Sequence, residues 1–248
     1  MKQRFGEAWE LLFHPAVAHR GLWSPDGPPE NSLGAFQAAC AAGYGIELDV
    51  QLSADGEAMV FHDDDLERMT GVVGKLGDRT AADLAELRLK GSDEPIPTLL
   101  ETMALVGHRA MVHVELKTPY GQVGPLERRT HEVLIDHNGP VCVIGFNPYS
   151  HAWFAQRFPG VLRGLDSYSY KRATHISDAQ RASFANLEHI SIAHPHFLAL
   201  GLDMLPSERA QTLRAEGLPV VAWTVRRPEQ WEAVREGCDN LIFEGFAP

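Results

Sequence analysis

The chain has 248 residues, of which 44% are hydrophobic, and its formal net charge is −11. This length fits one large domain or two small ones, and a single α/β barrel is within the range. The negative charge argues against nucleic acid and anionic membrane surfaces as main partners. The net negative charge does not exclude a small anionic substrate, because a local basic pocket can bind one.

The three cysteines are Cys40, Cys142 and Cys238, and they form no Cys-x-x-Cys pair. An odd number at wide spacing is typical of reduced thiols in a reducing compartment. The first 14 residues lack the apolar core of a signal peptide, and no run reaches the about 20 apolar residues that span a bilayer. We therefore expect a cytoplasmic protein without stable membrane insertion, and we leave a homo-oligomer open.

The first predicted elements are a strand at 16–18, a helix at 33–42 and a strand at 46–50. Asn31 or Ser32 can cap the helix, and the connection is long enough for a parallel crossover. In the strand at 46–50, Glu47 and Asp49 share one face and the apolar residues share the other. Two like charges so close require compensation, and a divalent cation would supply it. The alternative is an edge strand at the protein surface with one solvent-exposed face.

The segment after this strand leaves the parallel pattern. Asp55-Gly56 is a strong hairpin signal, so the strand at 58–63 runs back antiparallel and brings His62 to the level of Asp49. We expect a loop at 65–71, a helix at 80–89 capped by Thr80, and a helix at 98–106 capped by Thr98. Residues 52–110 are predicted to form an inserted subdomain within a single domain, 1–248.

The rest of the chain alternates strands with helices. Strands are predicted at 111–117, 141–144, 161–165, 189–193, 220–225 and 240–243, and helices at 124–137, 149–157, 178–186, 207–216 and 228–236. Cys142 falls in a continuous apolar run and is expected in the core. Eight strands, with the hairpin return left out, predict an α/β fold of the (β/α)₈ TIM-barrel type. In this fold the site lies at the carboxyl ends of the strands, where the chain places His19, Glu47, Asp49, Glu115, Lys117, Phe146, Trp223 and Glu244.

These residues form a set suited to phosphoryl transfer. The carboxylates of Glu47, Asp49 and Glu115 are ligands for Mg²⁺ or Ca²⁺. Arg20 and Lys117 can contact phosphate oxygens, and His19 and His62 can act as general acid and base.

Other interpretations of the same residues stay open. Each histidine could be structural, and the two cations could pair with the acids in a structural charge cluster. Trp223 could be core or pocket wall, Phe146 is favoured as pocket wall, and His113 is taken as structural.

The motifs also resemble a known family in sequence order. They are His19-Arg20-Gly21, Pro29-Glu30-Asn31-Ser32, Ala35-Phe36, Glu47-Leu48-Asp49-Val50, Asp55-Gly56, His62-Asp63, Leu66, Arg68, Thr70, Gly74, Ile96-Pro97-Thr98-Leu99, Glu115-Leu116-Lys117 and Trp223-Thr224-Val225. Together they resemble the glycerophosphodiester phosphodiesterases (GDPD family) over nearly the whole chain.

The resemblance implies a TIM barrel with a small insertion, and divalent-cation-dependent hydrolysis of glycerophosphodiesters to sn-glycerol 3-phosphate and an alcohol. It implies metal ligands at Glu47, Asp49 and Glu115, acid and base at His19 and His62, and phosphate contacts at Arg20 and Lys117. It also implies that Asn31 lies in the outer sphere of the metal. From their places at strand ends, Phe146 and Trp223 are expected to contact the substrate.

Three positions depart from the family pattern. Arg226 stands where the family usually has Asn, Glu244 where it has Asp, and Gly145 where it often has Ser. These departures affect the expected choice of alcohol more than the chemistry. Two further alternatives are a related lipid phosphodiesterase of the lysophospholipase D type and a barrel that binds phosphoesters without cleaving them.

Overall fold

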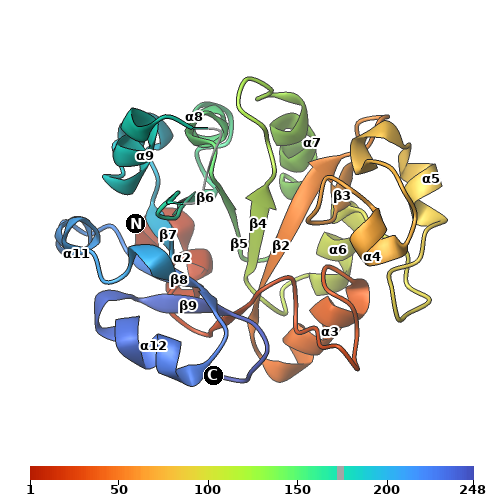
Figure 1. Ribbon diagram of the computed structural model, residues 1–248, viewed down its shortest axis with the longest axis horizontal. Coiled ribbons are helices and arrows are strands. Elements are labelled where there is room, and N and C mark those ends of the chain that lie inside the picture. The colour runs from red at the N-terminus through yellow and green to blue at the C-terminus, as the bar shows by residue number, and fades with distance from the viewer. Residues whose placement is uncertain (172–175) are drawn as a thin grey trace.

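The computed structural model describes residues 1–171 and 176–248, and its parallel strands close into a barrel surrounded by helices (Figure 1). β1 pairs with both β2 and β9, which closes the sheet, and β3 is an antiparallel addition beside β2. The predicted TIM barrel is therefore confirmed. The barrel strands are β1 (Val17–Ala18), β2 (Gly45–Leu52), β4 (Val112–Leu116), β5 (Val141–Gly145), β6 (Leu162–Ser167), β7 (Phe197–Gly201), β8 (Val220–Val225) and β9 (Asn240–Phe243).

Helices cover the outside of the barrel. They are α3 (Leu33–Ala42), α6 (Leu99–Val106), α7 (Pro125–Leu134), α8 (Pro148–Arg157), α9 (Asp178–Ala185), α10 (Ile190–Ala193), α11 (Glu208–Ala215) and α12 (Pro228–Val234), with short 3-10 turns at η2 (Leu202–Met204) and η3 (Arg235–Gly237). Ser32, rather than Asn31, caps α3 by accepting a hydrogen bond from the Ala35 N–H. Thr98 caps α6 as predicted and forms a capping box with Glu101.

The seventh strand was predicted at 189–193, and this is wrong. Residues Ile190–Ala193 form the one-turn helix α10, which ends at His194 in a left-handed conformation, and the strand is β7. The segment at 189–193 alternates in polarity, but so short a stretch cannot separate strand from helix. The run Phe197-Leu198-Ala199-Leu200 is continuously apolar, which is typical of a barrel strand buried on both faces.

Side chains on alternate positions of the strands build two separate cores. Leu48, Val114 and Leu198 belong to the outer core between the strands and the helices. Ile144 and Phe197 belong to the inner core. Because Leu48 points outward to the helices, its neighbours on β2 must point into the barrel.

Gly164 gives Phe197 the space it occupies in the inner core. A Cβ atom at position 164 would lie 2.2 Å from the Phe197 ring. The N-terminal helices α1 (Lys2–Phe5) and α2 (Glu7–Leu11) also contribute to this core, and Phe5 and Leu12 pack with it. Cys142 lies there too and is fully buried, as expected, and all three cysteines are free.

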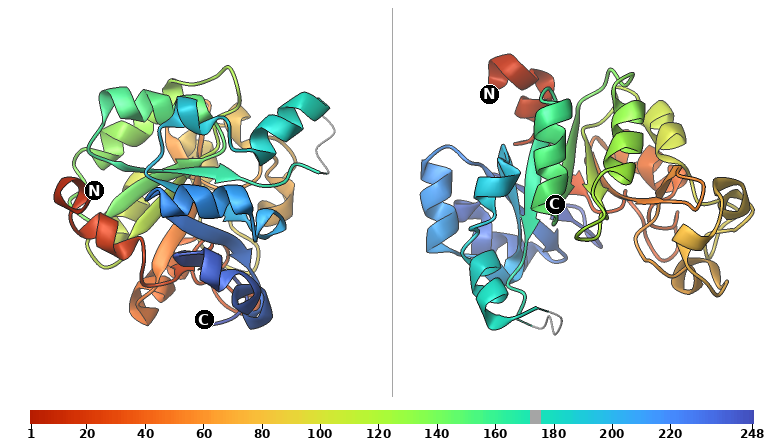
Figure 2. Two further views of the ribbon diagram at one scale, coloured as in Figure 1. Left: turned by 90° about the vertical axis from the view of Figure 1, so that its left-hand side faces the viewer. Right: turned by 90° about the horizontal axis from the view of Figure 1, so that it is seen from above.

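The segment after β2 forms a small side unit that projects from the barrel (Figure 2). It contains β3 (Ala58–Val60), α4 (Glu67–Thr70), η1 (Leu76–Asp78) and α5 (Ala81–Ala85). The unit has an apolar cluster of its own that includes Phe61, Leu76 and Leu84. α4 lies where a loop was predicted, and α5 is shorter than predicted although Thr80 caps it as expected.

The bounds of the inserted subdomain, 52–110, stay a prediction. Within this range, α6 packs against α3, and its Leu99 and Met103 belong to the outer core of the barrel. Among the described residues, no helix combines the length and the apolar character needed to cross a membrane.

We expect the His151→Gln variant to lose less unfolding free energy in acid than the wild type does. His151 on α8 is fully buried, and burial lowers the pKa of its imidazole to about 4. An unfolded chain takes up this proton below pH of about 6.5, so the stability from the neutral ring is complete above that pH and is lost as the pH falls towards 4. Between pH 7.5 and 5 the wild type should lose about 2 kcal/mol more unfolding free energy than the variant.

Denaturant titrations at the two pH values measure this difference. His108→Gln, which removes an exposed histidine, is the matched control. Equal losses in the wild type and in His151→Gln would contradict the assignment.

Candidate active site

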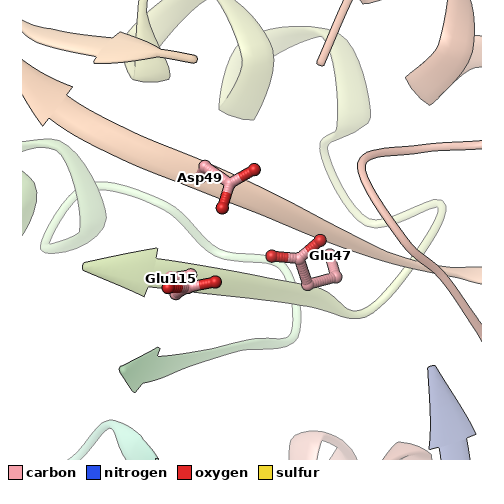
Figure 3. A group of neighbouring side chains, drawn as sticks. All are labelled: Glu47, Asp49 and Glu115. Atoms are coloured by element: carbon pink, nitrogen blue, oxygen red, sulfur yellow. The ribbon is translucent and has the colours of Figure 1, made fainter. Parts of the chain in front are cut away.

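Three buried carboxylates meet inside the barrel at the ends of two adjacent strands. Glu47 and Asp49 come from β2 and Glu115 from β4, and the parallel register places Asp49 beside Glu115 (Figure 3). Their side chains offer oxygen atoms that all lie within 4.8 Å of one another. The residues are 1%, 0% and 8% exposed. The sequence prediction that these three acids converge is confirmed.

Two cations offset part of this buried charge. The Lys117 Nζ lies 2.8 Å from Asp49 Oδ1 and 2.7 Å from Glu115 Oε1, and the Arg20 Nε lies 3.5 Å from Asp49 Oδ2. Burial alone would raise the pKa of Asp49, but Lys117 and other nearby positive groups hold it well below its usual value. Burial would also lower the pKa of Lys117, whereas Asp49 and Glu115 raise it. Asp49 therefore stays ionised although it is fully buried.

Glu47 is the carboxylate with the least compensation. Its Oε2 accepts a hydrogen bond from the Arg20 backbone N–H at 2.9 Å, but its Oε1 is buried without a hydrogen-bond partner among the described residues. Burial, with Asp49 and Glu115 close by, raises the pKa of Glu47 well above its usual value. An uncompensated oxygen in a set of hard oxygen donors fits a divalent cation such as Mg²⁺ or Ca²⁺. Glu47, Asp49 and Glu115 could therefore hold a metal ion.

Asn31 supports the cluster from the loop that precedes α3. Its Nδ2 donates to Asp49 Oδ2 at 2.8 Å, and the Asp49 N–H donates to Asn31 Oδ1 at 3.3 Å. Asn31 has a φ of 56°, a left-handed conformation that Asn adopts more readily than most residues. Asn31 orients one acid of the cluster, and such contacts to a ligand residue are typical of the outer sphere of a metal site.

His19 is held by a carboxylate that is itself paired with a cation. The His19 Nδ1 lies 2.5 Å from Glu244 Oε2, and the other Glu244 oxygen pairs with Arg226. Burial would raise the pKa of Glu244, but His19 and Arg226 lower it to about 2. The His19 Nε2 lies 3.9 Å from Glu47 Oε2. Glu244 thus orients His19 with its free nitrogen towards the acidic cluster, and Arg226 keeps Glu244 in place.

His62, which follows the hairpin strand β3, is held by the carboxylate of the next residue, Asp63. Its Nδ1 lies 2.6 Å from Asp63 Oδ1, and Asp63 also pairs with Arg68. Arg68 in turn binds Glu30 at 2.6 Å, and Glu30 binds Arg20 at 2.8 Å. Burial lowers the pKa of His62 below its usual value, against the pull of Asp49 and Asp63. This chain of alternating charges ties the hairpin to the loop after β1.

A cavity of about 260 Å³ joins the predicted site residues. Its walls include His19, Arg20, Glu47, His62, Glu115, Lys117, Phe146 and Trp223. Phe146 and Trp223 therefore form part of the cavity wall, the alternative to core packing named in the sequence analysis. Their ring centroids are 5.6 Å apart. Both histidines and both cations border this cavity together with Glu47 and Glu115, whereas Asn31 and Asp49 are not among its lining residues.

Asp166 on β6 is a cavity residue that the sequence analysis missed. It is 3% exposed, and its Oδ1 has no hydrogen-bond partner among the described residues. Burial, with Glu115 and Asp49 nearby, raises the pKa of Asp166 well above its usual value. The predicted strand at 161–165 ended two residues before the end of β6 and so left Asp166 out. The same alternation, carried one residue further, would have indicated that Asp166 points into the barrel.

Comparisons with known proteins agree with this geometry. The glycerophosphoryl diester phosphodiesterase family model matches residues 19–244. A glycerophosphodiester phosphodiesterase of Caldanaerobacter subterraneus subsp. tengcongensis is 30% identical over 237 residues, which is 91% of this chain and 92% of that protein.

Two solved structures have the same fold. An Oleispira antarctica phosphodiesterase in complex with the product sn-glycerol-3-phosphate has a TM-score of 0.81 at 24% identity, covering 96% of this chain and 94% of that one. A glycerophosphodiester phosphodiesterase from Thermotoga maritima has a TM-score of 0.73 at 26% identity, covering 93% and 94%. Because the family model matches residues 19–244 of this chain, the chain belongs to the glycerophosphoryl diester phosphodiesterase family, a family of phosphoric diester hydrolases.

Proposed function

We propose that the protein hydrolyses glycerophosphodiesters to sn-glycerol 3-phosphate and an alcohol, with a divalent cation and two histidines. The observation that carries this proposal is the meeting of three buried carboxylates and two carboxylate-bound histidines around one cavity. A structural charge cluster would explain the acids and the cations. It would not explain why both imidazoles border the same space with a carboxylate on Nδ1.

The anionic phosphodiester would lie against the positive groups of the cavity. Arg20 and Lys117 border the cavity and carry donors for its non-bridging oxygens. A Mg²⁺ or Ca²⁺ ion held by Glu47, Asp49 and Glu115 would supply further positive charge to the phosphate as negative charge develops. The aromatic rings of Phe146 and Trp223 would exclude water from the side of the site that they border.

The two histidines would move the two protons of the reaction. A carboxylate on Nδ1 favours the tautomer with the proton on that nitrogen, which leaves Nε2 free to take or give a proton. One imidazole would accept the proton of the attacking oxygen, and the other would protonate the departing oxygen. The attacking oxygen is either that of water or the 2-hydroxyl of the glycerol group, and the second route releases a cyclic phosphate first.

Removal of divalent cations should abolish the activity. Release of sn-glycerol 3-phosphate from glycerophosphocholine is measured in EDTA and again after excess Mg²⁺, Ca²⁺ or Mn²⁺ is restored. We expect loss of at least about 10²-fold in EDTA and recovery with one or more of the ions, because the cluster lacks enough positive charge without them.

Glu47→Gln should fail to recover under the same conditions. Glu132→Gln, on an exposed residue of α7, is the matched control. Turnover that is the same with and without chelator would refute the role of the metal.

Glu244→Gln should lower kcat because a neutral amide oxygen accepts the hydrogen bond from the His19 Nδ1–H more weakly than a carboxylate does. We expect a loss of roughly 10- to 100-fold, compared with about 10²- to 10⁴-fold for His19→Ala and for His62→Ala. Glu236→Gln, an exposed residue close in sequence, should leave kcat unchanged. The measurement is steady-state kinetics with melting temperatures for every variant. Near wild-type turnover in both histidine variants would refute the two-histidine mechanism.

A further inference from the structure

Gln51, on β2, binds the segment of chain that carries His62. Its Nε2 lies 3.0 Å from the carbonyl oxygen of Phe61, 3.0 Å from that of His62 and 2.9 Å from that of Asp63. Carbonyl oxygens only accept hydrogen bonds, so the amide nitrogen faces them and shares its two hydrogens among three acceptors. One side chain of the barrel thus holds three successive backbone groups around the imidazole.

The backbone of this segment has few other partners. The antiparallel pairing with β2 ends at Val60, and the Phe61 N–H makes one more hydrogen bond to the backbone of β2, at 3.0 Å (Figure 1). In the part of the chain that the structure describes, the backbone of His62 and that of Asp63 form no hydrogen bond with another backbone group. Gln51 therefore takes over where the strand ladder stops, and it satisfies carbonyls that the ladder no longer pairs.

The side-chain contacts of the segment lead away from the barrel. Asp63 binds the imidazole of His62, but it belongs to the same segment and would move with it. Arg68, which pairs with Asp63, lies in α4 of the side unit, and Phe61 packs in the apolar cluster of that unit. These contacts fix the imidazole relative to the side unit, whereas Gln51 fixes it relative to the barrel.

Gln51 also shares its strand with two acids of the cluster. Glu47, Asp49 and Gln51 alternate with apolar residues along β2, so their side chains leave the same face of the strand. Neighbouring members of this row are roughly 6–7 Å apart along extended backbone. The distance from the acids to the segment of His62 is therefore set through one strand.

We infer that Gln51 is a positioning residue for His62: it holds the backbone on both sides of the imidazole so that the free Nε2 reaches the reacting oxygen. The inference rests on the proposed function, because it takes His62 as one of the two groups that move protons. Gln51 is not among the described residues that line the catalytic cavity, and it borders a neighbouring groove of about 820 Å³ instead. It would thus act on the chemical step without touching the substrate.

Two substitutions remove the donor and keep the length of the side chain, Gln51→Met and Gln51→Glu. We expect each to lower kcat for glycerophosphocholine about 10- to 100-fold, because a displacement of about 1 Å at a reacting group can cost that much. KM should change less than about threefold, since no contact with the substrate is lost. Gln211→Met, the same substitution at an exposed glutamine of α11, should leave both parameters unchanged. Melting temperatures are measured for every variant.

A double-mutant cycle tests whether Gln51 acts through His62. In the His62→Ala background, Gln51→Met and Gln51→Glu should each lower kcat less than about threefold, because the group that Gln51 positions is gone. The same fold-loss in the wild type and in the His62→Ala background would overturn the inference, because a general weakening of the fold does not depend on the imidazole.

Metal binding excludes an effect through the acid cluster. Mn²⁺ is titrated by calorimetry into the wild type and Gln51→Met, and we expect equal affinities, because the Gln51 amide binds backbone carbonyls rather than the three acids. Mn²⁺ binding that weakens in step with kcat would overturn the positioning role. Wild-type kcat in Gln51→Met beside a large loss in His62→Ala would overturn it too and keep the hydrolase, whereas wild-type kcat in His62→Ala would refute the proposed mechanism itself.

Discussion

The burial of three carboxylates inside one barrel is the constraint on which the rest of the site depends. Each acid costs free energy when it leaves water, and each raises that cost for its neighbours. Lys117 lies between Asp49 and Glu115, and the Arg20 guanidinium lies near Asp49. Glu47 receives only the backbone N–H of Arg20 and keeps an oxygen without a hydrogen-bond partner among the described residues. The fold thus maintains a place where more positive charge is favourable, which is the environment that a divalent cation requires.

The barrel can accommodate these buried acids because its strands have two buried faces. The outward faces pack against helices and carry the stability of the fold, while the inward faces at the carboxyl ends are free to be polar. The carboxylates that bind the two histidines come from opposite parts of the chain, Glu244 for His19 and Asp63 for His62. Glu244 follows the last strand and Asp63 follows the hairpin, so closing the barrel and docking the side unit are both needed to complete the site.

Much of this could be predicted from the sequence because the signals are local. Apolar alternation places the acids on one face of β2, and Asp55-Gly56 turns the chain so that Phe61 lies opposite Asp49 and His62 follows it. The misplaced seventh strand shows the limit, since polarity over five residues fits strand and helix alike. The links from Asp63 through Arg68 to Glu30, and from His19 through Glu244 to Arg226, join residues up to 225 positions apart. Pairings of this kind depend on tertiary structure, and no spacing in the chain indicates them.

We propose that one divalent cation binds among Glu47, Asp49 and Glu115. The most direct test is anomalous X-ray scattering from crystals of the protein grown with Mn²⁺. The account predicts a single strong peak inside the barrel, in contact with carboxylate oxygens of all three residues. A peak at another place, or none while Lys117 alone bridges Asp49 and Glu115, would contradict it.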